Sequence, residues 1–129
     1  MNNEAQIRSL VENWARAVRE EDLPAIMAWH HEDIVMYDVP LPFQSIGIEA
    51  YRKTWDLFYS KQQVKDSFQI VNLTITAGED VAFCYTPMKC GYYEADGRCV
   101  YLDFRLTIGL KKIAGQWWVM HEHHSEPAA

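Results

Sequence analysis

The sequence predicts an α+β fold in which helices come first along the chain and a β-meander follows. Up to about residue 60, apolar residues recur at helical spacing. From Phe68 onward, apolar and polar residues alternate with a period of two, as in strands with one solvent-exposed face. Helices followed by consecutive strands are typical of α+β proteins. At 129 residues, of which 49% are hydrophobic, the chain has the size of one ordinary domain, and we expect a single domain over residues 1–129.

Two helices are expected near the N-terminus. From Ile7 onward, apolar residues at i, i+3, i+4, i+7 and i+11 form one stripe, which predicts an amphipathic helix from about residue 3 to residue 20. The side chain of Asp22 can cap a second, short helix, and the first turn of that helix can accept Pro24. We expect the polar run at 30–33, HHED, to end this second helix.

A short strand and a third helix are expected before the meander. The strand covers residues 34–38, and Pro40 and Pro42 then favour a loop. From Gly47, aromatic residues recur at helical spacing, which predicts the third helix. Alternating segments bounded by turn residues predict the strands that follow. These strands are residues 71–76, 80–94, 99–112 and 116–125.

Composition argues against several classes of partner. The formal net charge is −6, and no basic cluster is denser than Lys111-Lys112, so we expect no binding to nucleic acid or to an anionic membrane surface. The start of the chain lacks a secretory signal pattern, and no apolar run reaches the length of a membrane span. Cys84, Cys90 and Cys99 are odd in number and show no CxxC spacing, which favours a reducing, cytoplasmic location.

The stretch HEHH at 121–124 raises the question of function, and the turn at Ala114-Gly115 decides which way its side chains face. A loop of two or four residues fixes one register for the last two strands, and a three-residue loop breaks it. One face then carries Phe104, Leu106, Ile108, Leu110, Trp117, Val119, His121 and His123. The opposite face carries Asp103, Arg105, Thr107, Gly109, Trp118, Met120, Glu122 and His124.

A metal site at His121 and His123 is not favoured. On one strand face these side chains are about 6–7 Å apart, which suits two imidazole ligands. In the expected register, however, Ile108 and Leu106 lie opposite them, so the third protein ligand that zinc requires is missing. We therefore expect no metal, and interpret the two rings as hydrogen-bonded side chains at the end of the sheet.

A second group, Arg105, Glu122 and His124, would share one patch in the same register. Such a patch can shift the pKa of an imidazole or a carboxylate and can transfer protons. It can equally be a solvated ladder of charges on an exposed face. The sequence leaves both interpretations open.

Two segments carry a resemblance to a known superfamily. They read EEDLPAIMAWHHEDIVMYDVP, with GIEAY following, and W-x-V-x-H-x-H-x-S-x-P at the end of the chain. Together they resemble the nuclear transport factor 2-like superfamily, and more narrowly its SnoaL-like and ketosteroid-isomerase-like members. The ending is also similar to the association domain of calmodulin-dependent kinases. The resemblance implies a cone-shaped, curved, mixed β-sheet wrapped around three N-terminal helices, the cystatin-like α+β roll, with an apolar cavity inside.

The resemblance also implies a role for Asp38, which falls where ketosteroid isomerases carry their aspartate general base. From the residues alone, Asp38 can equally be a strand-end residue that caps the following turn. The sequence departs from the isomerase pattern at Trp14, Thr107 and Trp55, where stronger hydrogen-bond donors are usual. Steroid isomerase activity is therefore not expected, and both tryptophans can also be core residues.

The resemblance and the periodicity disagree about which sheet face is inside. Periodicity buries the face of Leu106 and Ile108 under the helices. In the relatives, the positions of Trp118, Met120 and His124 look into the cone, and a second subunit covers the other face. On this basis we expect a homodimer whose interface is the apolar sheet face.

The resulting expectation is a cofactor-free protein that binds a small apolar molecule bearing a carbonyl or carboxylate group. In the enzymatic form it is an isomerase, cyclase or dehydratase; the alternative is a ligand-binding or oligomerisation module without chemistry. The expected catalytic residues are Asp38, Arg105, Thr107, Glu122 and His124. The expected ligand-binding residues are Trp14, Met36, Trp55, Phe58, Met88, Trp118 and Met120.

Overall fold

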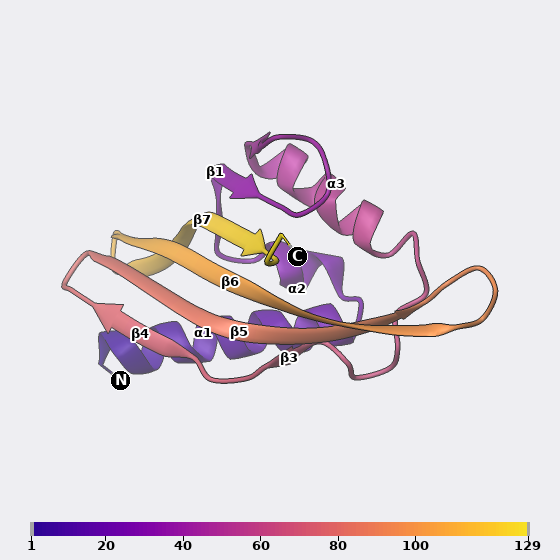
Figure 1. The fold of residues 1–129 in the computed structure, drawn as a ribbon. Coiled ribbons are helices and arrows are strands. Elements are labelled where there is room, and N and C mark those ends of the chain that lie inside the picture. Colours follow the sequence, from indigo (N-terminus) through magenta and orange to yellow (C-terminus); the bar gives the residue numbers. More distant parts are fainter. Residues whose placement is uncertain (1, 129) are drawn as a thin grey trace.

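The architecture is that of three helices packed on a curved, unclosed, mixed β-sheet, seen in a computed structural model that describes residues 2–128 (Figure 1). The predicted α+β class and the order of helices before meander are confirmed. No helix among these residues has the length and apolar composition to cross a membrane. The elements are α1 (Asn3–Arg19), α2 (Leu23–Met27), β1 (His30–Tyr37), β2 (Ser45–Ile46), α3 (Ile48–Phe58), β3 (Gln69–Ile70), β4 (Thr74–Ala77), β5 (Val81–Tyr93), β6 (Cys99–Ile113) and β7 (Gln116–Ser125).

The first two helices begin at capping residues. The side chain of Asn2 accepts a hydrogen bond from the backbone N–H of Ala5 at 2.8 Å, and this satisfies one free donor at the start of α1. Asp22 caps α2 as predicted, through a 3.2 Å hydrogen bond from the backbone N–H of Ala25. Pro24 lies in the first turn, where its missing N–H costs no hydrogen bond.

The expectation that residues 30–33 end the second helix is wrong. The helix α2 already ends at Met27, because Ala28 adopts an extended backbone angle and Trp29 has a positive φ of 61°. The chain therefore turns directly into β1, which begins at His30 and is longer than the strand predicted at 34–38. Neither glycine nor proline marks this turn, so no local residue pattern predicts it.

Strand order in the sheet is β2-β1-β7-β6-β5-β3, with β4 paired to the other part of β5. The pair β1–β7 is parallel and the other pairs are antiparallel, so the sheet is mixed. The helix α1 lies along the sheet (Figure 1), and its buried side chains join those of the strands in one core. Among the side chains with at most 2% exposure are Ile7, Val11, Ile34, Met36, Tyr51, Met88, Leu106, Ile108 and Trp117.

The turn between β6 and β7 has two residues, Ala114 and Gly115, both with positive φ as in a type I′ turn. The register next to this turn is the predicted one, with Ile113 opposite Gln116. The pattern then changes, because Leu110 pairs with Val119 while Gly109 pairs with His121. Met120 is the extra residue of a β-bulge, and a bulge shifts the alternation of all later side chains in its strand.

The bulge makes the predicted grouping of residues 121–124 with residues of β6 wrong, although Glu122 and His124 do face inward as the resemblance implied. Glu122 and His124 lie opposite Ile108 and Leu106, on the buried face. His121 and His123 lie opposite Gly109 and Thr107 on the outer face, and Ser125 lies opposite Arg105. For β6, the buried face is the one that the periodicity predicts, since Leu106 and Ile108 are buried under the helices of the same chain. This face is therefore not available as the dimer interface that we expected.

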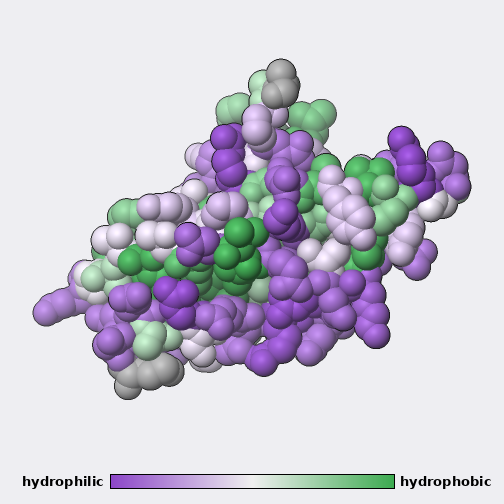
Figure 2. All heavy atoms as spheres, turned by 60° about the horizontal axis from the view of Figure 1, so that its bottom comes forward, coloured by the Kyte–Doolittle hydropathy of each residue, from purple (hydrophilic) through white to green (hydrophobic). Residues whose placement is uncertain are grey.

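The outer face of the sheet exposes several large apolar side chains. Val81, Phe83 and Tyr85 alternate along β5 with buried residues and are 60%, 48% and 48% exposed. Figure 2 shows hydrophobic residues gathered on the left of the molecule, the side on which β5 begins in Figure 1, with hydrophilic residues around them. A second apolar group lies in the loop after β1, where Leu41 and Phe43 are more than 80% exposed.

Candidate functional site

A cavity of about 380 Å³ opens between α3, the end of β1 and the far parts of β5, β6 and β7. Its walls are largely apolar, and they include the aromatic residues Trp55, Phe58, Phe68, Tyr92 and Phe104. This volume and this apolar lining suit a small organic molecule. The cavity is therefore the candidate functional site of the chain.

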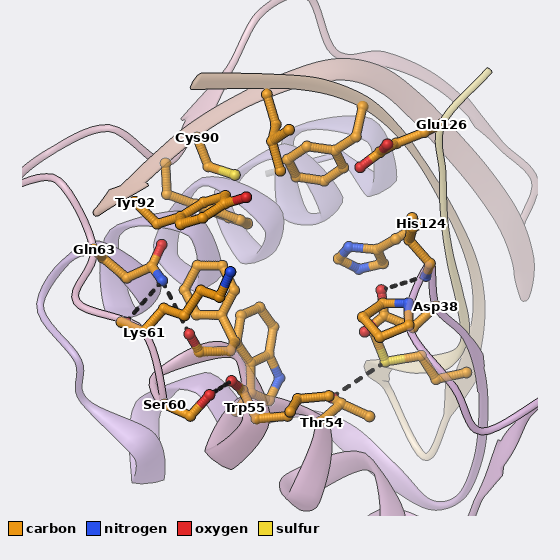
Figure 3. Close-up of a pocket in the computed structure, with 18 residues that line it drawn as sticks. Asp38, Thr54, Trp55, Ser60, Lys61, Gln63, Cys90, Tyr92, His124 and Glu126 are labelled. Carbon is orange, nitrogen blue, oxygen red and sulfur yellow. Dashed lines mark hydrogen bonds between the residues drawn. The ribbon is translucent and has the colours of Figure 1, made fainter. Parts of the chain in front are cut away.

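Ionisable side chains lie at two ends of the cavity (Figure 3). Asp38, His124 and Glu126 occupy one end, and Lys61 the other. The Lys61 ammonium lies 4.3 Å from the centre of the Tyr92 ring and 3.3 Å from a carboxylate oxygen of Glu94. An apolar ligand with polar groups at its two ends would fit this distribution of charge.

Five of the predicted site residues line this cavity. They are Met36, Asp38, Trp55, Phe58 and His124. The residues come from β1, α3 and β7, so the fold brings together segments that are far apart in the sequence. Asp38 follows β1 directly, and its carboxylate accepts a 2.8 Å hydrogen bond from the N–H of Val39.

Four predicted ligand-binding residues lie elsewhere. Met88 is fully buried in the core, on β5. Trp14 is also buried, but its ring contacts those of Trp55 and His124 from behind the cavity wall. Trp118 packs edge-on against the Trp29 ring at 5.4 Å, and Met120 is the bulge residue. None of the four is among the residues that line the cavity.

The predicted placement of Arg105 and Thr107 in the cavity is wrong. Both side chains are exposed on the outer face of β6, because their neighbours Phe104, Leu106 and Ile108 point inward. The Nε–H of Arg105 donates a 3.1 Å hydrogen bond to the hydroxyl of Ser125 on that outer face. Neither residue can contact a ligand inside the cavity.

A buried hydrogen-bond network is centred on Glu122, which has 0% exposure. Its Oε1 accepts hydrogen bonds from the hydroxyl of Tyr51 at 2.7 Å and from Nε2 of His30 at 2.8 Å. Its Oε2 lies 3.1 Å from Nε2 of His124. The Tyr51 hydroxyl in turn accepts a 3.2 Å hydrogen bond from the indole N–H of Trp14. Within residues 2–128, the carboxylate therefore has side-chain partners from β1, from α3 and from the next inward position of β7.

The network keeps Glu122 ionised. Burial raises the pKa of its carboxyl, but the hydrogen bonds from His124 and His30 and the favourable electrostatic interaction with these imidazoles outweigh that effect and lower the pKa from 4.5 to about 2. The pKa of the Tyr51 hydroxyl is raised well above its usual value, first by burial and then by the negative charge and hydrogen bond of Glu122. Tyr51 is therefore a neutral donor to an ionised carboxylate.

His124 connects this network to the cavity. Its ring is stacked on Phe104 at 5.6 Å and meets the edges of Trp14 and Trp55. An ionised Glu122 requires that Nε2 of His124 carries a hydrogen. Within residues 2–128, Nδ1 of His124 has no hydrogen-bond partner, so this nitrogen is available to a ligand in the cavity.

One more polar group lies at the boundary of cavity and network. The indole N–H of Trp55 is buried and, among the residues described, makes no hydrogen bond. It lies close to the Tyr51 hydroxyl but outside hydrogen-bonding geometry. A buried donor without an acceptor is costly, and a ligand oxygen would satisfy it.

Sequence reasoning missed His30 and Tyr51. His30 was assigned to a helix end, although its separation from Ile34 and Met36 by even numbers of residues was a weak signal that it shares their inward face. Tyr51 belongs to the aromatic stripe of α3 together with Trp55, and the stripe revealed its burial but not the partner of its hydroxyl.

The structure offers no metal centre in residues 2–128, where no group of three or more histidine, cysteine, aspartate or glutamate side chains could hold an ion. His121 and His123 lie on the outer face with the Tyr37 ring packed edge-on against both. Nδ1 of His121 donates a 2.6 Å hydrogen bond to the carbonyl oxygen of Val35.

Comparisons with known proteins agree with this architecture. An NTF2-like protein of unknown function from Pseudomonas putida KT2440 is 34% identical, with a TM-score of 0.83 over 98% of this chain and 89% of that one. A ketosteroid isomerase-like protein from Erwinia carotovora atroseptica SCRI1043 is 20% identical, with a TM-score of 0.81 over 100% of both chains. An NTF2-like protein with a cystatin-like fold from Novosphingobium aromaticivorans is 13% identical, with a TM-score of 0.79 over 98% of this chain and 84% of that one.

None of the curated proteins matches the chain at a significant level. A family model described as a SnoaL-like domain matches residues 7–129, which is nearly the whole chain and includes every residue of the cavity and of the network around Glu122. The match agrees with the resemblance seen in the sequence and with the NTF2-like fold of the solved structures. The chain belongs to the SnoaL-like domain family.

Proposed function

We propose that the cavity binds a small apolar molecule bearing a carbonyl or carboxylate group and catalyses a proton transfer on it without a cofactor. The observation that carries the proposal is the position of His124, a cavity-lining imidazole whose Nε2 is held by the buried carboxylate of Glu122. Such a pair fixes the tautomer of the ring and leaves the second nitrogen as a base. Isomerisation, cyclisation and dehydration all need a base of this kind.

Two groups at the same end of the cavity can exchange protons with the ligand. Nδ1 of His124 removes a proton from a carbon next to the ligand carbonyl, and the electron pair of the C–H bond moves into the enolate. Asp38, which lines the same end, is the second candidate for this base, as its position in the family suggests. The protonated base then returns the proton to another atom of the same ligand, so atoms and charge balance.

Negative charge that develops on the ligand oxygen needs a donor. Arg105 and Thr107 cannot supply it, since they lie on the outer face. The indole N–H of Trp55 is a buried donor without an acceptor in the described part of the chain, and we assign it this role. The ammonium of Lys61, at the other end of the cavity, is placed to attract a carboxylate of the ligand.

The test uses 2-tetralone, an aromatic-fused ketone with acidic hydrogens next to its carbonyl. Exchange of these hydrogens in D2O is followed by proton NMR, and binding is followed by quenching of tryptophan fluorescence. We expect the wild-type protein to accelerate exchange. The variants His124→Gln and Asp38→Asn each test one base; loss of a base costs about 10²–10⁴-fold in rate with dissociation constants nearly unchanged. Arg105→Ala, on the outer face, is the matched control and should exchange as the wild type does.

The outcomes separate the two functions considered for the chain. Binding of 2-tetralone without accelerated exchange would contradict catalysis and favour a ligand-binding module. A variant that loses binding and rate together would have removed a structural residue rather than a base. An Arg105→Ala variant that loses exchange would contradict the placement of the site in the cavity.

The proposal extends to assembly and location. The exposed apolar residues Val81, Phe83 and Tyr85 on the outer sheet face support a homodimer formed through that face. The three cysteines are unpaired, which supports a cytoplasmic location. Light scattering at micromolar concentration tests the dimer, and replacing Phe83 with a charged residue should yield a monomer.

A further inference from the structure

His30 is a buried titratable residue to which the proposed reaction assigns no role. It is the first residue of β1, and its side chain is 1% exposed. Its ring is stacked on the ring of Tyr51, with centroids 4.9 Å apart and an angle of 21° between the planes. The residue thus lies on the side of Glu122 that faces away from the cavity, in the interior of the fold.

Both ring nitrogens of His30 face oxygen acceptors. Nδ1 lies 2.9 Å from the carbonyl oxygen of Ala28, which cannot donate, so Nδ1 carries a hydrogen. Nε2 lies 2.8 Å from Oε1 of Glu122, which also accepts the hydroxyl proton of Tyr51. An ionised Glu122 leaves Nε2 as the donor. With hydrogens on both nitrogens, His30 is an imidazolium.

The charge of Glu122 needs one buried counter-charge. Among residues 2–128, four ionisable groups face this carboxylate, from four elements: His30 on β1, Tyr51 on α3, Cys84 on β5 and His124 on β7. Burial, and next the charge of Glu122, raise the pKa of the Cys84 thiol to about 12, and Tyr51 is a neutral phenol. Only the two histidines can carry the positive charge. His30 has two acceptors and His124 has one, so the geometry places the charge on His30.

We propose that His30 is a positioning residue for His124: as a permanent buried imidazolium it balances the charge of Glu122, so that His124 stays neutral, with its hydrogen on Nε2 and its lone pair on Nδ1. The use of that lone pair on a ligand rests on the proposed function above. The protonation states themselves do not, and they can be measured without any ligand.

The first test is a histidine NMR experiment on the 15N-labelled wild-type protein at neutral pH. Long-range proton–nitrogen correlations distinguish protonated from unprotonated ring nitrogens, and single His→Gln variants assign the five rings. We expect both nitrogens of His30 to carry hydrogens, and His124 to carry one on Nε2 alone. A neutral His30, or a hydrogen on Nδ1 of His124, would overturn the proposal.

The second test removes the charge. In His30→Gln the amide can still donate to Glu122, but the positive charge is gone, and we expect His124 to take up the proton and lose its free Nδ1. The other titratable side chains that line the cavity with His124 are Asp38, Lys61, Cys90, Tyr92 and Glu126, and none of them hydrogen-bonds to it among the described residues. Exchange of 2-tetralone at pH 7 should fall at least tenfold and recover as the pH rises.

Two control variants separate charge from packing. His31→Gln alters the neighbouring histidine, whose ring contacts Trp118 and not Glu122, and should leave the spectrum of His124 unchanged. Tyr51→Phe removes a neutral donor from the same carboxylate and should lower the melting temperature without moving the proton on His124. A His30→Gln protein in which His124 keeps its wild-type nitrogen signals would contradict the role of His30. If those signals move as expected but no variant or wild type exchanges 2-tetralone, the proposed reaction fails and the positioning role stands.

Discussion

Replacing Glu122 by glutamine tests the energetics of the buried network directly. The pKa of this carboxyl is lowered from 4.5 to about 2, and at about 1.4 kcal/mol per pH unit this corresponds to about 3 kcal/mol of stability at pH 7. Removing one partner of a buried ion pair costs about 3–5 kcal/mol, which is the same range. We therefore expect Glu122→Gln to lower the free energy of unfolding by about 3 kcal/mol at pH 7, measured by urea denaturation.

The difference in the free energy of unfolding between the wild type and Glu122→Gln should become smaller in acid. The folded-state pKa of Glu122 lies below the unfolded-state value, so its contribution is fully present above about pH 4.5 and is lost as the pH falls toward 2. By the same relation, the contribution is only about 1 kcal/mol at pH 3. The gap between wild type and variant should therefore shrink by roughly half or more between pH 7 and pH 3.

A matched control is Glu126→Gln, four residues further along, where the side chain is exposed. This change should alter the free energy of unfolding by no more than about 0.5 kcal/mol at either pH. A Glu122→Gln protein as stable as the wild type at pH 7 would refute the view that the carboxylate is ionised and paired in the folded state. A gap of constant size from pH 7 to pH 3 would refute the link to its ionisation.

Two further predictions concern other parts of the fold. A methyl group added at Gly91 would lie 2.8 Å from two ring atoms of Tyr101. Gly91→Ala should therefore lower the free energy of unfolding by about 1–3 kcal/mol, unless the Tyr101 ring swings outward. A change in tyrosine fluorescence or a crystal structure of the variant would reveal such a movement. Burial raises the pKa of Cys84 to about 12 and that of Cys90 to about 11, whereas Cys99 is exposed. In the native protein at pH 8, only Cys99 should react quickly with a thiol reagent, and after denaturation all three cysteines should react. Rapid reaction of all three cysteines in the native protein would contradict the packing of β5.

The regular elements could be predicted from the sequence because each has a period that extends over several residues. The apolar stripe of α1, the cap at Asp22 and the alternation along β5 and β6 are local patterns with one simple structural solution. The turn into β1 at Trp29 was missed because a positive φ at a bulky residue has no local signal. Tertiary packing imposes it.

The candidate site was predicted less well, for a reason that lies in a single residue. Asp38 and His124 line the cavity, where the likeness to known relatives puts them. Arg105 and Thr107, which a strict alternation through Met120 groups with His124, lie on the outer face instead. A bulge is set by how two strands fit over the curved core, and no pattern within one strand reveals it. His30 was missed because its partner, Glu122, lies 92 residues away in the sequence.

The extra residue at position 120 changes which side chains of the ten-residue strand β7 face the interior. Before it, Trp117 and Val119 point to the core, and after it the inward positions pass to the even-numbered residues Glu122 and His124. If the same residues paired with β6 in strict alternation, without the bulge, His121 and His123 would face inward and Glu122 and His124 would face outward. In this chain, one local break in the alternation thus decides the chemistry of the interior as much as residue identity does. Deletion of Met120 would remove the break and still leave His121 opposite Gly109, so Glu122 and His124 would keep their inward places.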